Sequence, residues 1–249
     1  MSSLRKKSGL VIIGDEILSG RTLDTNSNFL SKNLSEKGID VKEVAVVQDK
    51  EFEIINKVKE FSNKYDIVFT TGGIGPTHDD ITTSSISKAF NLKYKINTEA
   101  QMLLKKHYSL PGELTQARLK MAFIPEGATL IYNPISVAPG FKVKNVCVFP
   151  GVPQIMQGMF NNFIDTLTTT TKMPQISVTT TLSEGIIGEY VANIQIKYSN
   201  VKIGSYPYFK NGDFGVTLVL KSEDRKLLDY VSSEIFEYLK KLDGKPKYL

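Results

Sequence analysis

The sequence predicts an α/β protein in which a three-layer domain with a mostly parallel sheet precedes a smaller α+β domain. Three observations support this prediction. Short β-branched runs alternate with helical patterns over the first 70 residues, a threonine-rich segment breaks the pattern after Ile164, and strand and helix patterns resume at residue 176. With 249 residues and 41% hydrophobic content, the chain can bury a substantial core. We therefore expect two domains, residues 1–167 and 175–249.

The first 70 residues alternate between strands and helices. The hydrophobic patterns predict strands at 8–14, 39–47 and 66–70, and helices at 26–38 and 52–61. This alternation forms parallel β-α-β units with helices on both faces of the sheet. Ligands of such sheets bind outside the carboxyl ends of the strands, so the loops that follow these strands are the candidate site.

The remainder of the chain completes the two domains. We expect further elements as follows: helical structure over 97–121 broken at Pro111-Gly112, strand 145–149, helix 154–163, strands 176–182 and 215–220, and helices 183–194 and 222–242. Segment 205–215 is aromatic and rich in turn residues, and its rings are expected to pack in a core or at an edge rather than against a ligand. Because a short sheet with exposed edges pairs easily, we expect a homo-oligomer.

The segment TGGIGPTHDDITT, residues 71–83, directly follows the third strand. Gly72, Gly73 and Gly75 have no Cβ, so the backbone can take positive φ and bring N–H groups close to a ligand. A helix that starts near Ile81 favours anions at its N-terminus. The segment therefore suits the binding of a phosphate.

Asp79 and Asp80 in the same segment repel a bare phosphate unless a divalent cation lies between them. Ions such as Mg²⁺ commonly use one or two carboxylates together with substrate phosphates, which favours Mg²⁺, Mn²⁺ or Co²⁺ as a cofactor. Two other loops bring carboxylates to the same sheet edge, at Glu16 and at Asp49. The alternative is a plain glycine turn in which Asp79 or Asp80 caps a helix.

The charge distribution argues against a nucleic-acid partner. The formal net charge is +5, but residues 5–7 carry +3 and residues 240–249 carry another +3, so residues 8–239 together carry −1. A nucleic-acid-binding protein more often spreads its basic residues over the folded body.

Cysteine content and hydropathy indicate a cytoplasmic protein. Cys147 is the only cysteine, so no disulfide framework exists, and its apolar neighbours indicate a buried thiol. The longest apolar run has four residues, and the first residues lack the apolar region of a signal peptide. We therefore expect no membrane partner.

Seven motifs, taken together in their order along the chain, resemble the molybdopterin-binding-like domain of the CinA (competence-damage-inducible) family. They are GDEIL (14–18), DTN (24–26), Asp49, TGGIGPTHDDIT (71–82), NP (133–134), APG (138–140) and PGVP (150–153). The same domain is similar to the N-terminal half of eukaryotic FAD synthases and, more distantly, to MogA and MoeA. The resemblance implies a MogA/MoeA-like fold and metal-dependent hydrolysis of the pyrophosphate bond of a nucleotide such as ADP-ribose or FAD.

The resemblance also implies roles for individual residues. Asp49, Asp79 and Asp80 would be catalytic, and Asp79 and Asp80 would bind the metal. The residues that would bind the nucleotide are Gly14, Glu16, Asn26, Thr71, Gly72, Gly73, Gly75, Thr77, Asn133 and Gly151. Two alternatives stay open: a molybdopterin-binding protein of molybdenum cofactor biosynthesis, or a non-catalytic nucleotide-binding scaffold. Two departures from the family pattern, Gln154 and Ser136-Val137, leave room for the scaffold.

Overall fold

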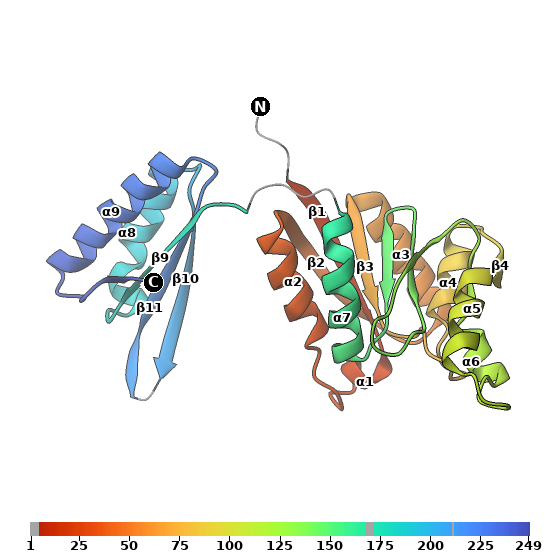
Figure 1. Ribbon diagram of the computed structural model, residues 1–249. Coiled ribbons are helices and arrows are strands. Elements are labelled where there is room, and N and C mark those ends of the chain that lie inside the picture. The colour runs from red at the N-terminus through yellow and green to blue at the C-terminus, as the bar shows by residue number, and fades with distance from the viewer. Residues whose placement is uncertain (1–4, 168–171, 211) are drawn as a thin grey trace. The chain divides into compact units, whose positions relative to one another are not determined.

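The computed structural model describes residues 5–167, 172–210 and 212–249. The chain divides into two compact units, Met1–Thr171 and Lys172–Leu249, and Figure 1 shows the elements of each. Each unit has its own sheet and its own buried core.

The first unit is built on a six-stranded sheet with the order β2-β1-β3-β8-β7-β6. The strands are β1 (Lys6–Ile13), β2 (Ile39–Val47), β3 (Ile67–Thr71), β6 (Thr129–Ile131), β7 (Gly140–Val143) and β8 (Val146–Phe149). β2, β1, β3 and β8 are parallel, and β7 pairs antiparallel with both β8 and β6. The predicted mostly parallel sheet is confirmed, and its antiparallel edge was not predicted.

Helices cover both faces of this sheet. α2 (Asn26–Glu36) and α7 (Pro153–Phe163) lie on one face, and α3 (Glu51–Lys64) and α4 (Thr82–Ala89) lie on the other (Figure 1). Along β1, Leu10 and Ile12 belong to the core cluster under α2 and α7, while Val11 and Ile13 belong to the cluster under α3 and α4. Because successive side chains of a strand point to opposite faces, burial on both sides explains the uninterrupted apolar run of β1.

Smaller elements complete the first unit. They are α1 (Asp15–Leu18), β4 (Tyr94–Ile96), α5 (Thr98–His107), α6 (Gln116–Lys120), β5 (Phe123–Pro125) and the 3₁₀ turn η1 (Ile164–Thr166). The predicted helical stretch 97–121 is interrupted between α5 and α6, where Gly112 has φ +82°. The break at Pro111-Gly112 is therefore confirmed.

The second unit has a βαββαβ order and a four-stranded antiparallel sheet, arranged β10-β11-β9-β12. Its elements are β9 (Gln175–Thr180), α8 (Glu184–Lys197), β10 (Lys202–Lys210), β11 (Asp213–Lys221), α9 (Arg225–Lys241) and β12 (Lys247–Tyr248). Val178, Leu218 and Leu220 of the sheet pack against Ile187 of α8 and Leu228 of α9. The predicted α+β character of this unit is confirmed.

β10 and the start of β11 were not predicted. They pair along segment 205–215, with Phe209 opposite Phe214, and Gly212, one of its turn residues, lies between them. The alternating aromatic residues of this segment fit a pleated strand. Pro207 is tolerated because β10 is an edge strand, where a missing N–H need not face a neighbour. None of the described helices combines the length and the apolarity that crossing a bilayer requires.

Candidate functional site

The loops that follow four parallel strands meet in one cleft of the first unit. Its volume is about 570 Å³. In the sheet, β2 lies on one side of β1 and β3 on the other, so the direction in which strands are added reverses at β1. The cleft lies at this reversal, which is the position at which open α/β sheets bind ligands. The residues that line it are Ile13, Gly14, Glu16, Arg21, Thr22, Asp49, Gly72, Gly73, Ile74, Gly75, Pro76, Asp79, Asp80, Pro150, Gly151, Val152 and Pro153.

The glycine loop after β3 lies in close contact with the neighbouring backbone. Gly72 has φ +104°, and a Cβ there would lie 2.0 Å from the carbonyl oxygen of Ile13. Gly73 has φ +67°, and a Cβ there would lie 2.2 Å from Oγ1 of Thr82. The Gly72 N–H donates to the carbonyl of Phe149 (3.1 Å). Glycine is therefore required at both positions, and the loop is fixed to the ends of β1 and β8.

Asp79 and Asp80 form a pair around Thr77. The Thr77 backbone N–H donates to Oδ2 of Asp80 (2.8 Å), and the Thr77 hydroxyl contacts both carboxylates. The hydroxyl lowers the pKa of Asp79 below its ordinary value. Gly75 leaves the space that Asp80 occupies, since a Cβ there would lie 2.7 Å from Oδ2 of Asp80.

The alternative in which these carboxylates cap a helix does not agree with the geometry. The N-cap position of α4 is Ile81, and no side chain there makes a capping hydrogen bond. Asp80 instead bonds backward to Thr77, and both carboxylates line the cleft.

Asp49 brings a third carboxylate from the loop after β2. It accepts a hydrogen bond from the Asp15 N–H (2.8 Å). Burial raises the pKa of Asp49 above its ordinary value, and the nearby charges of Asp15, Glu16 and Asp79 raise it further. The cleft therefore collects negative charge that a bound cation would relieve.

The donor set fits one kind of metal site. Among the described residues, no group of three or more His, Cys, Asp or Glu side chains is close enough to enclose an ion by itself. Asp79 and Asp80 line the same cleft as the glycine loop, which suits a cation shared between one or two carboxylates and the oxygens of a bound phosphate.

Several buried oxygens near the cleft have no hydrogen-bond partner within the described residues. They are Oδ1 of Asn26 and Oγ1 of Thr70, Thr71 and Thr82. The other side of the Asn26 amide donates to the carbonyl of Gly151 (2.8 Å), which lines the cleft. Because buried polar groups are usually satisfied, these atoms are candidates for contacts with a ligand or with water.

The structure brings most of the predicted site residues together. Those that line the cleft are Gly14, Glu16, Asp49, Gly72, Gly73, Gly75, Asp79, Asp80 and Gly151. Asn26, Thr71 and Thr77 lie directly beside it, and the polar groups of Thr77 are used by Asp79 and Asp80.

Asn133 lies apart from these residues and does not line the cleft. Its Oδ1 accepts from the N–H groups of Ile135 and Ser136 (2.9 Å each), and its Nδ2 donates to the carbonyl of Ala138 (2.9 Å). In this structure its side chain therefore supports its own loop.

Arg21 is a cleft residue that the sequence analysis did not select. It lies in the loop after β1, three residues beyond α1. Its closeness in sequence to the GDEIL motif is the one sequence feature that could have predicted it. Two other cations of the first unit, Arg118 and Lys120, are engaged in contacts with the protein itself. Arg118 donates to the carbonyl of Glu113 (2.6 Å) and lies over the ring of Tyr108, and Lys120 donates to the carbonyl of Thr77 (2.5 Å).

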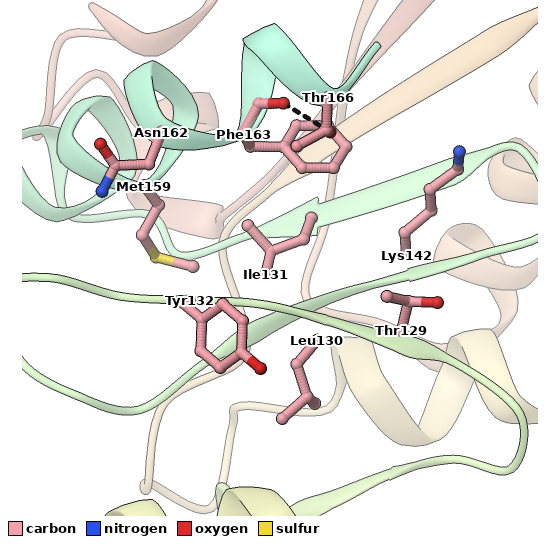
Figure 2. Close-up of a pocket in the computed structure, with 9 residues that line it drawn as sticks. All are labelled: Thr129, Leu130, Ile131, Tyr132, Lys142, Met159, Asn162, Phe163 and Thr166. Atoms are coloured by element: carbon pink, nitrogen blue, oxygen red, sulfur yellow. Dashed lines mark hydrogen bonds between the residues drawn. The ribbon is translucent and has the colours of Figure 1, made fainter.

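A second cavity lies at the edge of the same sheet. Figure 2 shows that β6, β7 and α7 line it, with Ile131, Met159 and Phe163 around a volume of about 320 Å³. None of the predicted site residues lines this cavity, so it is distinct from the cleft.

Comparison with known families agrees with this architecture. Residues 9–169 match the family described as a probable molybdopterin binding domain. The chain belongs to the molybdopterin-binding domain family. Residues 172–243 match the family described as the FAD synthase middle domain. The resemblance and the fold class predicted from the motifs are thereby confirmed.

Two related sequences and one crystal structure illustrate the relatives of this molybdopterin-binding domain protein. The probable FAD synthase of Caenorhabditis briggsae is 31% identical over 94% of this chain and 50% of its own length, so the chain spans about half of that relative. A protein of Sulfurisphaera tokodaii is 35% identical over 76% of each chain. The crystal structure of the CinA protein with unknown function from Thermoplasma acidophilum superposes with a TM-score of 0.62 at 35% identity, covering 66% of this chain and 99% of that one.

Proposed function

We propose that this protein hydrolyses the pyrophosphate bond of a nucleotide such as ADP-ribose or FAD, with Mg²⁺, Mn²⁺ or Co²⁺ as a cofactor. The observation that carries the proposal is the single cleft that combines the glycine loop of Gly72 and Gly73 with the carboxylates of Asp49, Asp79 and Asp80. Backbone amides suit phosphoryl oxygens, and carboxylates suit the cation and the water that the reaction needs.

The residues of the cleft divide this work. Asp79 and Asp80 would hold the cation, which supplies charge neutralisation on the pyrophosphate. The backbone of the glycine loop and the guanidinium of Arg21 would orient the phosphates. Asp49 would orient the water and accept its proton, because a carboxylate with a raised pKa is a better base near neutral pH than an ordinary one.

The balance of the reaction is simple. One water oxygen forms a bond to phosphorus, the bridging P–O bond breaks, and a proton passes to the carboxylate. ADP-ribose would yield AMP and ribose 5-phosphate, and FAD would yield AMP and FMN. A serine or cysteine nucleophile is not required, in agreement with the burial of Cys147.

The test is to incubate the pure full chain with ADP-ribose or FAD and each metal, and to measure AMP by chromatography. Asp80→Asn should lower AMP release by about 100-fold or more while the far-UV spectrum stays unchanged. The matched control is Asp165→Asn, because Asp165 is exposed, pairs with Lys37 and lies beyond the far end of α7 from the cleft. Full activity of Asp80→Asn would remove Asp80 from this role.

A second candidate function is molybdopterin binding in molybdenum cofactor biosynthesis. The family match over residues 9–169 favours it. Copurification of molybdopterin with the chain, without AMP release, would support this candidate.

A third candidate is a scaffold that binds nucleotide without turnover, and two departures from the family pattern, at Gln154 and Val137, favour it. Val137 has φ +65°, a conformation that β-branched residues rarely adopt. Tight nucleotide binding without AMP release would support the scaffold. Cytoplasmic location and self-association remain predictions.

A further inference from the structure

The four-stranded sheet of the second unit has one face that neither α8 nor α9 covers. Val178, Leu218 and Leu220 are buried under these helices. Residues adjacent to them in sequence point to the opposite side. We call this side the open sheet face, and the residues that matter on it are Lys202, Tyr206, Tyr208, Thr217, Lys221 and Lys247.

Two tyrosine rings lie flat on the open sheet face. A Cβ at Gly204 would lie 2.7 Å from the ring of Tyr206, two residues along the same strand. A Cβ at Gly215 would lie 2.8 Å from Cζ of Tyr208, its cross-strand partner. The rings therefore rest on glycine backbone instead of standing upright, and Tyr206 remains 57% exposed. This arrangement offers aromatic faces to solvent.

Two lysines lie at the other end of β10 and β11. Lys202 and Lys221 are directly opposite each other in the register, where like charges repel. Within the part of the chain that the structure describes, neither lysine has an ion-pair partner. Lys247 adds a third positive charge opposite Thr179 on the same face. An anionic ligand would relieve this repulsion.

The two lysines also line a cavity of about 450 Å³ with Ser199 and Asn200. Two carboxylates share its wall. Asp224 is the N-cap residue of α9, since its Oδ1 accepts from the Leu227 N–H (3.0 Å), and Glu223 has an interaction of its own. The Leu227 N–H engages Asp224 but leaves its charge in place. The open sheet face, on which the register places Lys202 and Lys221, carries the lysines without these carboxylates, so phosphates are expected on that side.

We propose that the open sheet face binds single-stranded nucleic acid, with bases stacked on Tyr206 and Tyr208 and phosphates at Lys202 and Lys221. Flat aromatic side chains on a four-stranded sheet stack unpaired bases, and nearby cations track the backbone. Lys202 and Tyr206 are four residues apart on one strand, about 13 Å. One nucleotide does not reach from a phosphate at one to a base at the other, which favours a strand over a free nucleotide.

This proposal departs from the expectation based on charge along the chain. That expectation counted net charge along residues 8–239, where residues 8–171 carry 0 and residues 172–239 carry −1, and it did not consider which face each charge occupies. Within the second unit, most of the acidic residues belong to α8 and α9. The sheet register instead collects Lys202, Lys221 and Lys247 on one face of the second unit. The proposal does not depend on the pyrophosphatase proposal, because the two concern different units.

The test uses the full chain and fluorescein-labelled 12-nucleotide single strands of mixed sequence, RNA and DNA, in fluorescence anisotropy at 50 and 200 mM salt. Tyr206→Ala should weaken binding about tenfold or more, whereas Tyr206→Phe keeps the ring and should stay within about twofold. The double variant K202Q and K221Q should make the log–log salt slope shallower by about 1.4. Lys240→Gln is the matched control, because Lys240 is exposed on α9. In the background of this variant, Tyr206→Ala should weaken binding by the same factor as in the wild type.

Three results would overturn the proposal. The first is no binding of either strand at 50 mM salt. The second is binding that neither Tyr206→Ala nor the double lysine variant weakens, which would assign it to the basic chain ends. The third is a wild-type chain that binds neither strand but self-associates, with the self-association lost in Tyr206→Ala. That result would make the open sheet face an interface between two copies. Asp80→Asn should bind the strands as wild type does, so failure of the pyrophosphatase proposal is distinguishable.

Discussion

The two units of this chain leave different surfaces for binding because they cover their sheets differently. In the first unit, helices bury both faces of a mostly parallel sheet, and the candidate site lies in the loops at the strand ends. In the second unit, helices bury one face of an antiparallel sheet, and the other face remains accessible. Both units contain β-α-β crossovers, and strand order decides the difference. In the first unit, parallel strands are added first on one side of β1 and then on the other, so right-handed crossovers place helices on both faces. In the second unit, both crossovers place their helices on the same face.

The two surfaces also use glycine for different purposes. The cleft depends on glycines that let backbones approach, as at Gly72 beside Ile13. The open sheet face depends on glycines that let rings lie flat, as at Gly204 beneath Tyr206. Glycine therefore creates space in both units, for a loop in one and for a side chain in the other.

The largest expected effect tests whether the two cores are independent. Leu218 is fully buried in the second unit, and Leu218→Ala should cost about 2–5 kcal/mol there. Val219→Ala is the matched control, because Val219 is half-buried on the open face and should cost less than about 1 kcal/mol. Denaturant unfolding followed by hydrogen exchange should show loss of protection in the second unit alone. Equal loss in the first unit would mean that the two cores unfold together.

The next effect tests the close approach in the cleft. Gly72→Ala places a methyl 2.0 Å from a backbone oxygen and forces φ +104° on a residue with a Cβ, so we expect a loss of about 1–3 kcal/mol. Displacement of the loop should also lower AMP release by about 100-fold. Gly127→Ala is the control: Gly127 has φ +79° with open space around it, so it carries the cost of positive φ alone. Equal effects of the two variants would contradict the role of the contact.

A smaller effect is expected on the pH dependence of stability, because several carboxylates lie near one another in the cleft. Because the pKa of Asp49 is raised in the folded protein, its ionisation costs stability as pH rises above the ordinary value of 3.8. Asp49→Asn removes this cost, so the melting temperature of the variant minus that of wild type should increase from pH 4 to pH 7. Asp165→Asn should show no such increase, since Asp165 is exposed and paired with Lys37. A difference that falls with pH would contradict the raised pKa.

The smallest expected effect concerns alkylation of the buried Cys147, which should not occur in the native protein. Burial raises the pKa of Cys147 to about 12, so the native thiol should resist alkylation at pH 8 and react only after unfolding. Leu218→Ala should leave Cys147 protected, because the cysteine belongs to the core of the first unit. Rapid labelling of native Leu218→Ala would again indicate shared unfolding.

The sequence predicted some parts of the site better than others. The loops with Gly72, Asp49 and Asp79 follow strand patterns whose order along the chain already implies one sheet edge. Arg21 was missed because no periodic pattern places it, and only the path of the loop after α1 brings it to the cleft. The β10–β11 hairpin was missed because turn residues within 205–215 masked an alternation that cross-strand pairing stabilises.

The sequence by itself determined the order of strands and helices, the glycine loop and the supply of carboxylates, because hydrophobic period and side-chain chemistry are local properties of the chain. Only the tertiary structure decided which groups meet. Asn26 bonds to Gly151, 125 residues away, Asn133 turns to its own loop, and Lys202 faces Lys221. Such contacts depend on sheet register and loop path, which no single stretch of sequence encodes.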